Sequence, residues 1–232
     1  MINAAGGALL AIGSLSFFYF ALWHLSIATT YSTWSAALQT AWVAEIISLA
    51  VATAGGALMV RKAESALART LARAGLQRRG VAQAQMERHA HGFALWPAGW
   101  AGSLAHSGGW SVAALARTAQ VRCVGIDVED PARMRRALWG HILTPAEQAA
   151  ADALGADAAQ LRGAAVFSAK EAVYKAIYPL LGSAPGFQQA ELHWQSAAAF
   201  RVSVPPNWAV QLQGIYAVFD GMLFAVVWQP AA

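Results

Sequence analysis

The chain has 232 residues and a formal net charge of +4, with 57% hydrophobic and only 12% charged residues. This weak positive charge, without a basic stripe interleaved with aromatic residues, argues against a nucleic-acid-binding protein. The single cysteine, Cys123, excludes an intrachain disulfide and fits a reducing compartment.

The first sixty residues are strongly apolar, and Glu45 is their single charged residue. Residues 7–29 form a run longer than the roughly 20 residues that span a bilayer, and residues 36–60 form a second run of spanning length. Arg61 and Lys62 follow at once, so the positive-inside rule places this end in the cytoplasm. We predict a helical membrane hairpin within residues 7–60, with both chain ends cytoplasmic.

Two other interpretations of this segment stay open: a buried hairpin in a soluble protein, or a segment not native to the domain, from an unusual gene start or a fusion. In an apolar setting Glu45 needs a partner, because an unpaired buried charge is costly. A signal peptide is disfavoured, because no basic stretch precedes the first run and a second run follows it.

The remaining chain, residues 61–232, carries 16 basic and 11 acidic side chains, a net charge of +5. Apolar spacing predicts a helix over 61–76, neighbouring strands over 110–117 and 121–128 joined at 118–120, and a helix over 132–143. A capping box begins another helix at Thr144. Antiparallel strands are expected over 191–194, 200–204, 210–219 and 223–228, with turns at 205–206 and 220–221. The class is therefore α+β.

Residues 124–129 (VGIDVE) form the first motif, in which aliphatic residues alternate with Gly125, Asp127 and Glu129. This period predicts a half-buried strand with both carboxylates on one face, roughly 7 Å apart. Gly125 shares that face and is expected to leave room for a ligand. Two carboxylates on one face suit Mg²⁺, which binds carboxylates, waters and phosphate oxygens.

Residues 167–175 (FSAKEAVYK) form the second motif, on a helix expected to end before Pro179. An apolar stripe occupies one face, and Glu171 can meet Lys175 at i, i+4 spacing on another. Taken singly, each motif is better explained as a solvated strand face or a surface ion pair worth a few tenths of a kcal/mol. Together they gather three carboxylates and two lysines that can surround a divalent metal and a pyrophosphate.

His106 lies in a Gly- and Ser-rich stretch predicted to be a turn before the 110–117 strand. Loops of that composition let backbone N–H groups approach phosphates, so we favour a ligand-binding role over a structural one. The other histidines considered lack metal-ligand spacing and are predicted to be structural: His89, His91, His141 and His193.

The two motifs, about forty residues apart, resemble those of the 4′-phosphopantetheinyl transferase superfamily, and most closely its enterobactin-synthetase component D branch. Residues 96–107 (WPAGWAGSLAHS) and 61–69 (RKAESALAR) are similar to two further segments of that branch. The resemblance covers about residues 61–228 in order. It implies a pseudo-dimeric fold of two similar α/β halves over residues 61–232, preceded by the apolar segment 1–60.

The resemblance implies Mg²⁺-dependent transfer of the phosphopantetheine arm of coenzyme A to a carrier-protein serine, with release of 3′,5′-ADP. This is the holo-acyl-carrier-protein synthase type of activity, which this branch uses in siderophore and other secondary metabolism. The implied metal ligands are Asp127, Glu129 and Glu171. The implied catalytic residues are Glu171, as base, and Lys175. The implied coenzyme A contacts are Lys62, Arg69, Ser103, His106 and Lys170.

The chain also departs from the family pattern. Ala105 stands where the family has a serine, Ala68 where it has a glycine, and the stretch before Trp96 lacks the usual basic residue, for which Arg88 or His91 can substitute. These departures support a rival function, a non-catalytic coenzyme A-binding or carrier-docking protein of the same fold. An unrelated membrane protein with chance matches is harder to reconcile with four segments in order.

Overall fold

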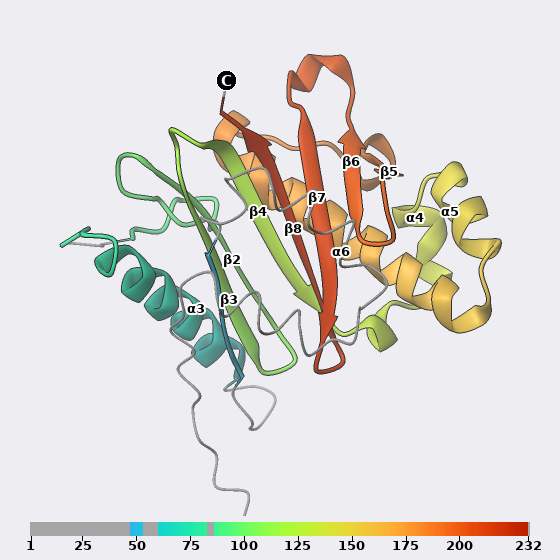
Figure 1. Cartoon of the computed structure of the whole chain (residues 1–232), viewed down its shortest axis with the longest axis horizontal. Helices are drawn as coiled ribbons and strands as arrows, with labels where there is room; N and C mark the ends of the chain where they lie inside the picture. Colours follow the sequence, from blue (N-terminus) through green and yellow to red (C-terminus); the bar gives the residue numbers. More distant parts are fainter. Residues whose placement is uncertain (1–46, 53–59, 83–85, 232) are drawn as a thin grey trace, which may run out of the picture.

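The computed structural model describes residues 47–52, 60–82 and 86–231, which form two antiparallel sheets (Figure 1). The first sheet has the strand order β1-β3-β2, with β1 at Ile47–Ala52, β3 at Trp110–Arg117 and β2 at Trp100–Ser107. The second has the order β4-β8-β7-β6-β5. Its strands are β4 (Val121–Glu129), β5 (Glu191–Trp194), β6 (Ala199–Ser203), β7 (Leu212–Phe219) and β8 (Met222–Pro230). The predicted α+β class is confirmed.

Each sheet packs against one long helix. Helix α3 (Val60–Gln77) lies on the first sheet, where Leu71 and Leu76 pack with Trp100 and Leu115. Helix α6 (Ala156–Leu181) crosses behind the second sheet in Figure 1, and the short helices α4 (Trp139–Ile142) and α5 (Pro145–Asp152) lie beside its first half. This arrangement places the two predicted motifs, on β4 and α6, in direct contact.

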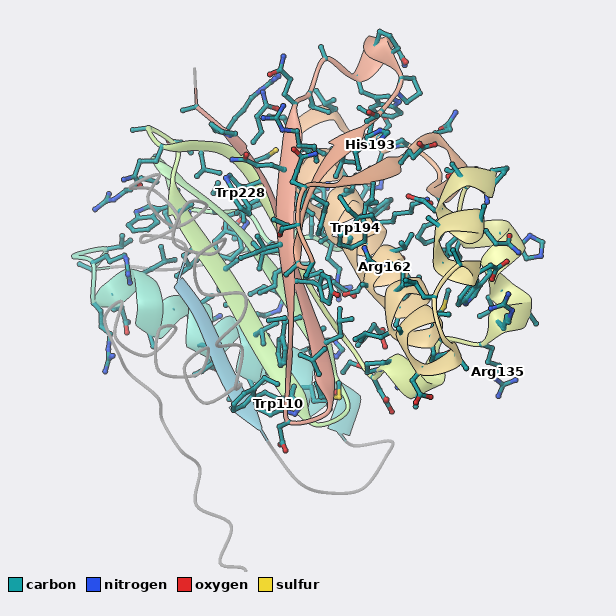
Figure 2. The ribbon with its side chains drawn as sticks, turned by 45° about the vertical axis from the view of Figure 1, so that its right-hand side comes forward. Trp110, Arg135, Arg162, His193, Trp194 and Trp228 are labelled. Carbon is teal, nitrogen blue, oxygen red and sulfur yellow. The ribbon has the colours of Figure 1, made fainter. Side chains whose placement is uncertain are left out.

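The predicted apolar stripe of α6 is buried, and its members all belong to one core cluster: Val166, Ala169, Val173 and Ile177. The helix is also tied to β5 through Arg162, whose guanidinium carbon lies 3.8 Å from the Trp194 ring centroid (Figure 2). The predicted end before Pro179 is wrong, because α6 continues to Leu181 and ends at Gly182 in the left-handed conformation.

Gly125 allows α6 to approach β4 closely. A Cβ atom at this position would lie 1.8 Å from the backbone oxygen of Ala172, so no other residue fits without a shift of the helix. The space predicted for a ligand at Gly125 is therefore occupied by α6 itself. This contact brings Asp127, two residues along β4, against the helix that carries Glu171 and Lys175.

The two sheets meet where β2 runs beside β4. The backbone N–H of Ile126 donates to Ser103 Oγ at 3.1 Å across this junction. Apolar side chains fill it, including Ala105 and Val112 from the first sheet and Val124 and Val128 from β4. Strands β3 and β4 are joined at 118–120 as predicted, but they belong to different sheets and are not a hydrogen-bonded pair.

Two further predictions are corrected. Residues 132–143, expected as one helix, contain two 3₁₀ turns, Pro131–Arg133 and Arg136–Leu138, followed by α4. Of residues 102–109, expected as a Gly- and Ser-rich turn, residues 102–107 belong to β2, and only Gly108 and Gly109 form the turn. The capping box is confirmed, since Thr144 Oγ1 accepts from the Glu147 backbone N–H and Glu147 Oε2 from that of Thr144. The C-terminal strands are confirmed, β5 with its predicted ends and the others with end shifts of at most two residues.

The second predicted membrane span contains β1, whose six residues pair antiparallel with β3 from Ile47↔Leu115 to Ala52↔Trp110. A spanning helix over residues 36–60 is therefore wrong for these six residues. Among the residues that the structure describes, no helix is long and apolar enough to cross a membrane. The first predicted span, residues 7–29, and Glu45 lie outside the described residues.

Candidate functional site

A pocket of about 420 Å³ opens between α3, the segment before β2, β2 itself and the last turns of α6. Its lining includes four basic side chains, Arg69, Arg88, His106 and Lys175. Aromatic residues form much of the remaining wall: His91, Phe93, Trp96, Tyr174 and Tyr178. A basic and aromatic lining suits a ligand that combines phosphate groups with a flat apolar ring.

The predicted coenzyme A contacts divide into three groups. Arg69 from α3 and Ser103 and His106 from β2 line this pocket together with the predicted catalytic residue Lys175. Lys62 lies in α3, about two turns before Arg69, and its side chain is outside the described residues. Lys170 is not at the pocket.

Lys170 is buried on the other side of α6, with a side chain 1% exposed. Its ammonium donates to three oxygens: Glu147 Oε2 at 2.6 Å, Ile142 O at 2.8 Å and Phe187 O at 2.8 Å. An ammonium has three donors, and all are used here. This placement contradicts a phosphate contact by Lys170 and assigns it to the packing of α4 and α5 against α6.

Lys175 connects the pocket to the acidic motif. Its Nζ donates to Asp127 Oδ1 at 2.6 Å, while the second oxygen of Asp127 accepts from Ser168 Oγ at 2.8 Å. Asp127 is buried, whereas the Lys175 side chain is 28% exposed. The predicted i, i+4 pair of Glu171 with Lys175 is replaced by this pair with β4, since Lys175 reaches across to the strand.

The three predicted metal ligands share one electrostatic environment. Burial raises the pKa of Glu171, and the nearby charge of Asp127 raises it further, against an opposing effect of Lys175. Burial also raises the pKa of Glu129, again with a contribution from Asp127. Glu129 accepts a long hydrogen bond from Ser107 Oγ at 3.5 Å. Glu129 and Glu171 thus have raised pKa values beside the carboxylate of Asp127. A bound cation would stabilise the ionised forms of such a group.

The type and charge of these donors fit a divalent cation, because Mg²⁺ binds carboxylate oxygens and keeps water and phosphate oxygens as its other ligands. The donors are not gathered into a closed set: the described part of the chain has no group of three His, Cys, Asp or Glu side chains placed to hold a metal ion. Lys175 and Ser168 instead occupy the two oxygens of Asp127.

Comparison with known proteins identifies the family. The model described as "4'-phosphopantetheinyl transferase superfamily" matches residues 123–221, and the model described as "4'-phosphopantetheinyl transferase N-terminal domain" matches residues 50–116. Together the two matches cover more than half of the chain. The protein belongs to the 4′-phosphopantetheinyl transferase superfamily.

Curated members of the superfamily are similar to part of this chain. This chain is 35% identical over 130 residues to 4'-phosphopantetheinyl transferase Svp of Streptomyces mobaraensis. The alignment covers 56% of this chain and 53% of Svp. The chain is 35% identical over 142 residues to 4'-phosphopantetheinyl transferase PptT of Mycobacterium tuberculosis, covering 59% and 60% respectively. The chain thus spans little more than half the length of the curated relatives it matches. These relatives do not single out the enterobactin branch, which stays a prediction.

Solved structures give a weaker likeness. A holo-(acyl-carrier-protein) synthase from Bacillus anthracis in complex with CoA (3',5'-ADP) aligns with a TM-score of 0.41 and 20% identity, over 49% of this chain and 99% of that one. The enzyme from Thermotoga maritima aligns with a TM-score of 0.41 and 22% identity, over 48% and 65%. The α+β class rests on the structure of this chain itself.

Within this phosphopantetheinyl transferase fold, the sequence predictions missed an aromatic wall. The Tyr174 and Tyr178 rings stack with centroids 5.1 Å apart. The Tyr178 ring also makes T-shaped contacts with the rings of His91 and Phe93, with centroids 6.0 Å apart in each pair. His91, predicted to be structural, therefore lines the pocket. The i, i+4 spacing of the two tyrosines was the available sign, because it places both on one face of α6.

The departures from the family pattern have different consequences in the structure. Arg88 lines the pocket and donates from Nε to Gly92 O at 3.3 Å, so a basic residue is present before Trp96. Ala105 is buried in the apolar junction between the sheets and is not part of the pocket lining. Ala68 does line the pocket and is 1% exposed. The loss of a hydroxyl at Ala105 thus leaves the pocket wall unchanged.

Proposed function

We propose that this protein transfers the 4′-phosphopantetheine arm of coenzyme A to a serine hydroxyl of an acyl or peptidyl carrier-protein domain, and that it releases 3′,5′-ADP. One observation carries the proposal. Lys175 lies at the wall of a basic, aromatic pocket and is also hydrogen-bonded to the buried carboxylate of Asp127. A nucleotide-like ligand in the pocket would thus place a phosphate next to Glu171 and Lys175.

In this proposal the pocket holds the nucleotide part of coenzyme A. Arg69, Arg88 and His106 are positioned around it to pair with phosphate groups, and charge-assisted hydrogen bonds of this kind are strong and directional. The rings of Tyr174 and Tyr178 offer an apolar face beside these charges. Because the pocket draws residues from both α3 and α6, a bound ligand would contact both parts of the fold. This agrees with the predicted binding between two halves of a pseudo-dimer.

Asp127, Glu129 and Glu171 would supply carboxylate ligands to a Mg²⁺ ion, provided that their side chains move together from the arrangement described above. When bound, the ion would neutralise pyrophosphate charge and polarise the phosphorus under attack. Burial raises the pKa of Glu171 in the metal-free protein, and a positioned carboxylate is one of the groups that act as general bases. Glu171, directly or through a water, takes the proton of the carrier serine as the serine oxygen forms a bond to the β-phosphorus. The bond from that phosphorus to 3′,5′-ADP breaks, and Lys175 stabilises the negative charge of the leaving group.

The setting of the reaction follows from the same proposal. Coenzyme A and carrier proteins are cytoplasmic, so we place the catalytic domain, β1 together with residues 61–232, in the cytoplasm. Of the predicted membrane hairpin, only the part before β1 stays a prediction. The net charge of +5 on residues 61–232 favours approach of an acidic carrier domain and of an anionic cofactor. The holo-acyl-carrier-protein synthase type and a role in siderophore or other secondary metabolism complete the proposal.

A transfer assay tests it. Purified full-length protein is mixed with coenzyme A, Mg²⁺ and a panel of apo-carrier proteins, and the carriers are weighed by intact mass spectrometry. We expect a mass gain of one phosphopantetheine that disappears on chelation. Asp127→Ala and Glu171→Ala should lower the rate at least about 10²-fold, the smaller end of the contribution of a general base. Glu87→Ala, at an exposed carboxylate, is the matched control and should keep the wild-type rate.

The same assay separates this function from the rival one. Coenzyme A binding without any mass gain on any carrier would favour a non-catalytic coenzyme A-binding protein. Near-normal transfer by either carboxylate variant would refute the assigned catalytic centre while leaving the activity itself in place.

A further inference from the structure

Glu64 is a buried carboxylate to which neither motif assigns a role. It lies in the second turn of α3 and is 4% exposed. Removing an ionised carboxylate from water is costly unless its oxygens are hydrogen-bonded, so its partners explain why it is there. Oε1 accepts from the backbone N–H of Gly109 at 2.8 Å, and Oε2 lies 3.3 Å from Nδ1 of His106.

These contacts fix the end of the β2–β3 hairpin to α3. Ser111 Oγ adds a bond to the backbone oxygen of Glu64 at 3.0 Å, directly after the turn at Gly109. His106, the second-last residue of β2, is held between this anchored turn and the pocket, with its side chain 33% exposed. Ser65, next to Glu64, and Arg69 line the same pocket as His106. Glu64 thus lies directly behind the pocket wall.

The chemistry of the pair determines how His106 is presented. The two groups form an ion-pair contact, and because an ionised carboxylate only accepts hydrogen bonds, a hydrogen shared between them would belong to Nδ1 of the imidazole. Nε2 is then the ring nitrogen left for the pocket. Phosphate oxygens are acceptors as well, so an Nε2 that binds phosphate must also carry a hydrogen. The ring that bridges Glu64 and a phosphate is therefore the imidazolium, with a negative charge on each side of it.

We propose that Glu64 is the positioning residue for His106: its buried carboxylate holds Nδ1–H of the imidazole so that Nε2–H donates to an anionic phosphate oxygen of the bound substrate. This inference rests on the proposed function, because it assumes that the pocket takes the phosphates of coenzyme A. It adds to that function a residue that touches no substrate and acts through the orientation and charge state of His106.

Glu64→Gln tests the proposal in the full chain, because the amide keeps the shape of the carboxylate but loses its charge and one acceptor oxygen. We expect coenzyme A to bind about tenfold more weakly by calorimetry. This is the lower end of the loss in affinity seen when the hydrogen-bond partner of a metal-binding histidine is removed. KM for coenzyme A should rise while kcat changes little, as for an interaction made equally in the ground and transition states. Glu191→Gln is the matched control, because Glu191 lies 4.0 Å from His193 in an exposed pair on β5. Figure 2 shows His193. The control should leave coenzyme A affinity unchanged.

A double-mutant cycle with His106→Ala decides between positioning and a purely structural role. If Glu64 acts through His106, the double variant binds coenzyme A no more weakly than His106→Ala alone. If the loss from Glu64→Gln is added in full to that of His106→Ala, Glu64 acts through the turn at Gly109 and the proposal is overturned. An unchanged affinity in Glu64→Gln overturns it as well.

Nitrogen NMR of the ligand-free protein tests the pair without any substrate. The His106 ring should carry its hydrogen on Nδ1 in the wild type, and this pattern should change in Glu64→Gln but persist in Glu191→Gln. A wild-type ring without hydrogen on Nδ1 contradicts the positioning role. Absence of both coenzyme A binding and transfer in the wild type, with the NMR pattern intact, refutes the proposed function and with it the phosphate contact, while the Glu64–His106 link itself is retained.

Discussion

At the scale of single residues, the two lysines of the second motif have opposite environments. Lys170 and Lys175 are five residues apart, which on a helix turns the second by about 140° from the first. One therefore enters the packing of α4 and α5, and the other reaches Asp127 and the pocket. In the sequence both are basic residues near an acid. Their different partners follow from the orientation of α6 relative to β4, which the sequence does not show.

Glu171, the proposed general base, is expected to reduce the free energy of unfolding when its carboxylate is ionised. Its pKa is raised in the folded protein, chiefly by burial and then by Asp127, so folding favours its protonated form. Below the unfolded-state pKa of about 4.3, the carboxyl is protonated in both states and destabilises nothing. As the pH rises through the raised folded-state pKa, the ionised carboxylate makes folding less favourable.

Glu171→Gln should therefore stabilise the protein at neutral pH while abolishing transfer. We expect a gain within the about 0.5–2 kcal/mol that single stabilising substitutions commonly give, and no gain near pH 4. Chemical unfolding between pH 4 and 8 in the presence of a chelator measures the difference. Glu87→Gln, at an exposed carboxylate, should show none. A Glu171→Gln variant that is less stable than the wild type at neutral pH would contradict the assigned environment.

At the scale of elements, the contact of β4 with α6 forms the centre of the site. Gly125 permits it, and Asp127 uses it to meet Ser168 and Lys175. Tertiary contacts also explain the failed prediction over 132–143. The side-chain amide of Gln160 in α6 donates to the backbone oxygens of Pro131 and Met134, at 2.8 and 2.7 Å. Both carbonyls thus have a partner on α6, and Pro131 O also accepts the 3₁₀ hydrogen bond from the Met134 N–H, so the chain forms short turns there and no continuous helix.

Gly125→Ala should separate β4 from α6. The added Cβ meets a backbone oxygen, which cannot rotate away as a side chain can, so the helix must shift. We expect a loss of at least about 1–3 kcal/mol in unfolding free energy, the usual cost of overpacking, together with a large loss of transfer. Gly140→Ala in α4 is the matched control, because a Cβ there meets no atom within 4 Å. Equal stability of the two variants would show that β4 and α6 are not packed this closely.

At the scale of the whole molecule, the sequence supported part of the answer. Local patterns predicted β4, the buried stripe of α6, the capping box at Thr144 and the meeting of the two motifs. They could not predict that β3 and β4 belong to different sheets, because the pairing of β4 with β8 joins residues about a hundred positions apart. The role of Glu64 was hidden for the same reason, since its partners Gly109 and His106 lie more than forty residues away.

The apolar run over residues 36–60 is the largest disagreement, because hydropathy cannot distinguish a spanning helix from a strand buried in a sheet. The structure places Ile47–Ala52 along β3, which lies between β1 and β2 in the first sheet. A chain lacking residues 1–46 keeps this strand, whereas one lacking residues 1–52 leaves the edge of β3 unpaired.

Comparing these two truncations tests the strand. We expect the shorter deletion to keep cooperative urea unfolding and coenzyme A binding. The longer one should lose a few kcal/mol, since each backbone hydrogen bond contributes about 0.5–1.5 kcal/mol. Its coenzyme A affinity should fall as well, because β2 belongs to this sheet, α3 packs on it, and both elements line the pocket. Equal stability of the two truncations would mean that Ile47–Ala52 adds nothing to the sheet, and the interpretations of the apolar segment given above would then be open again.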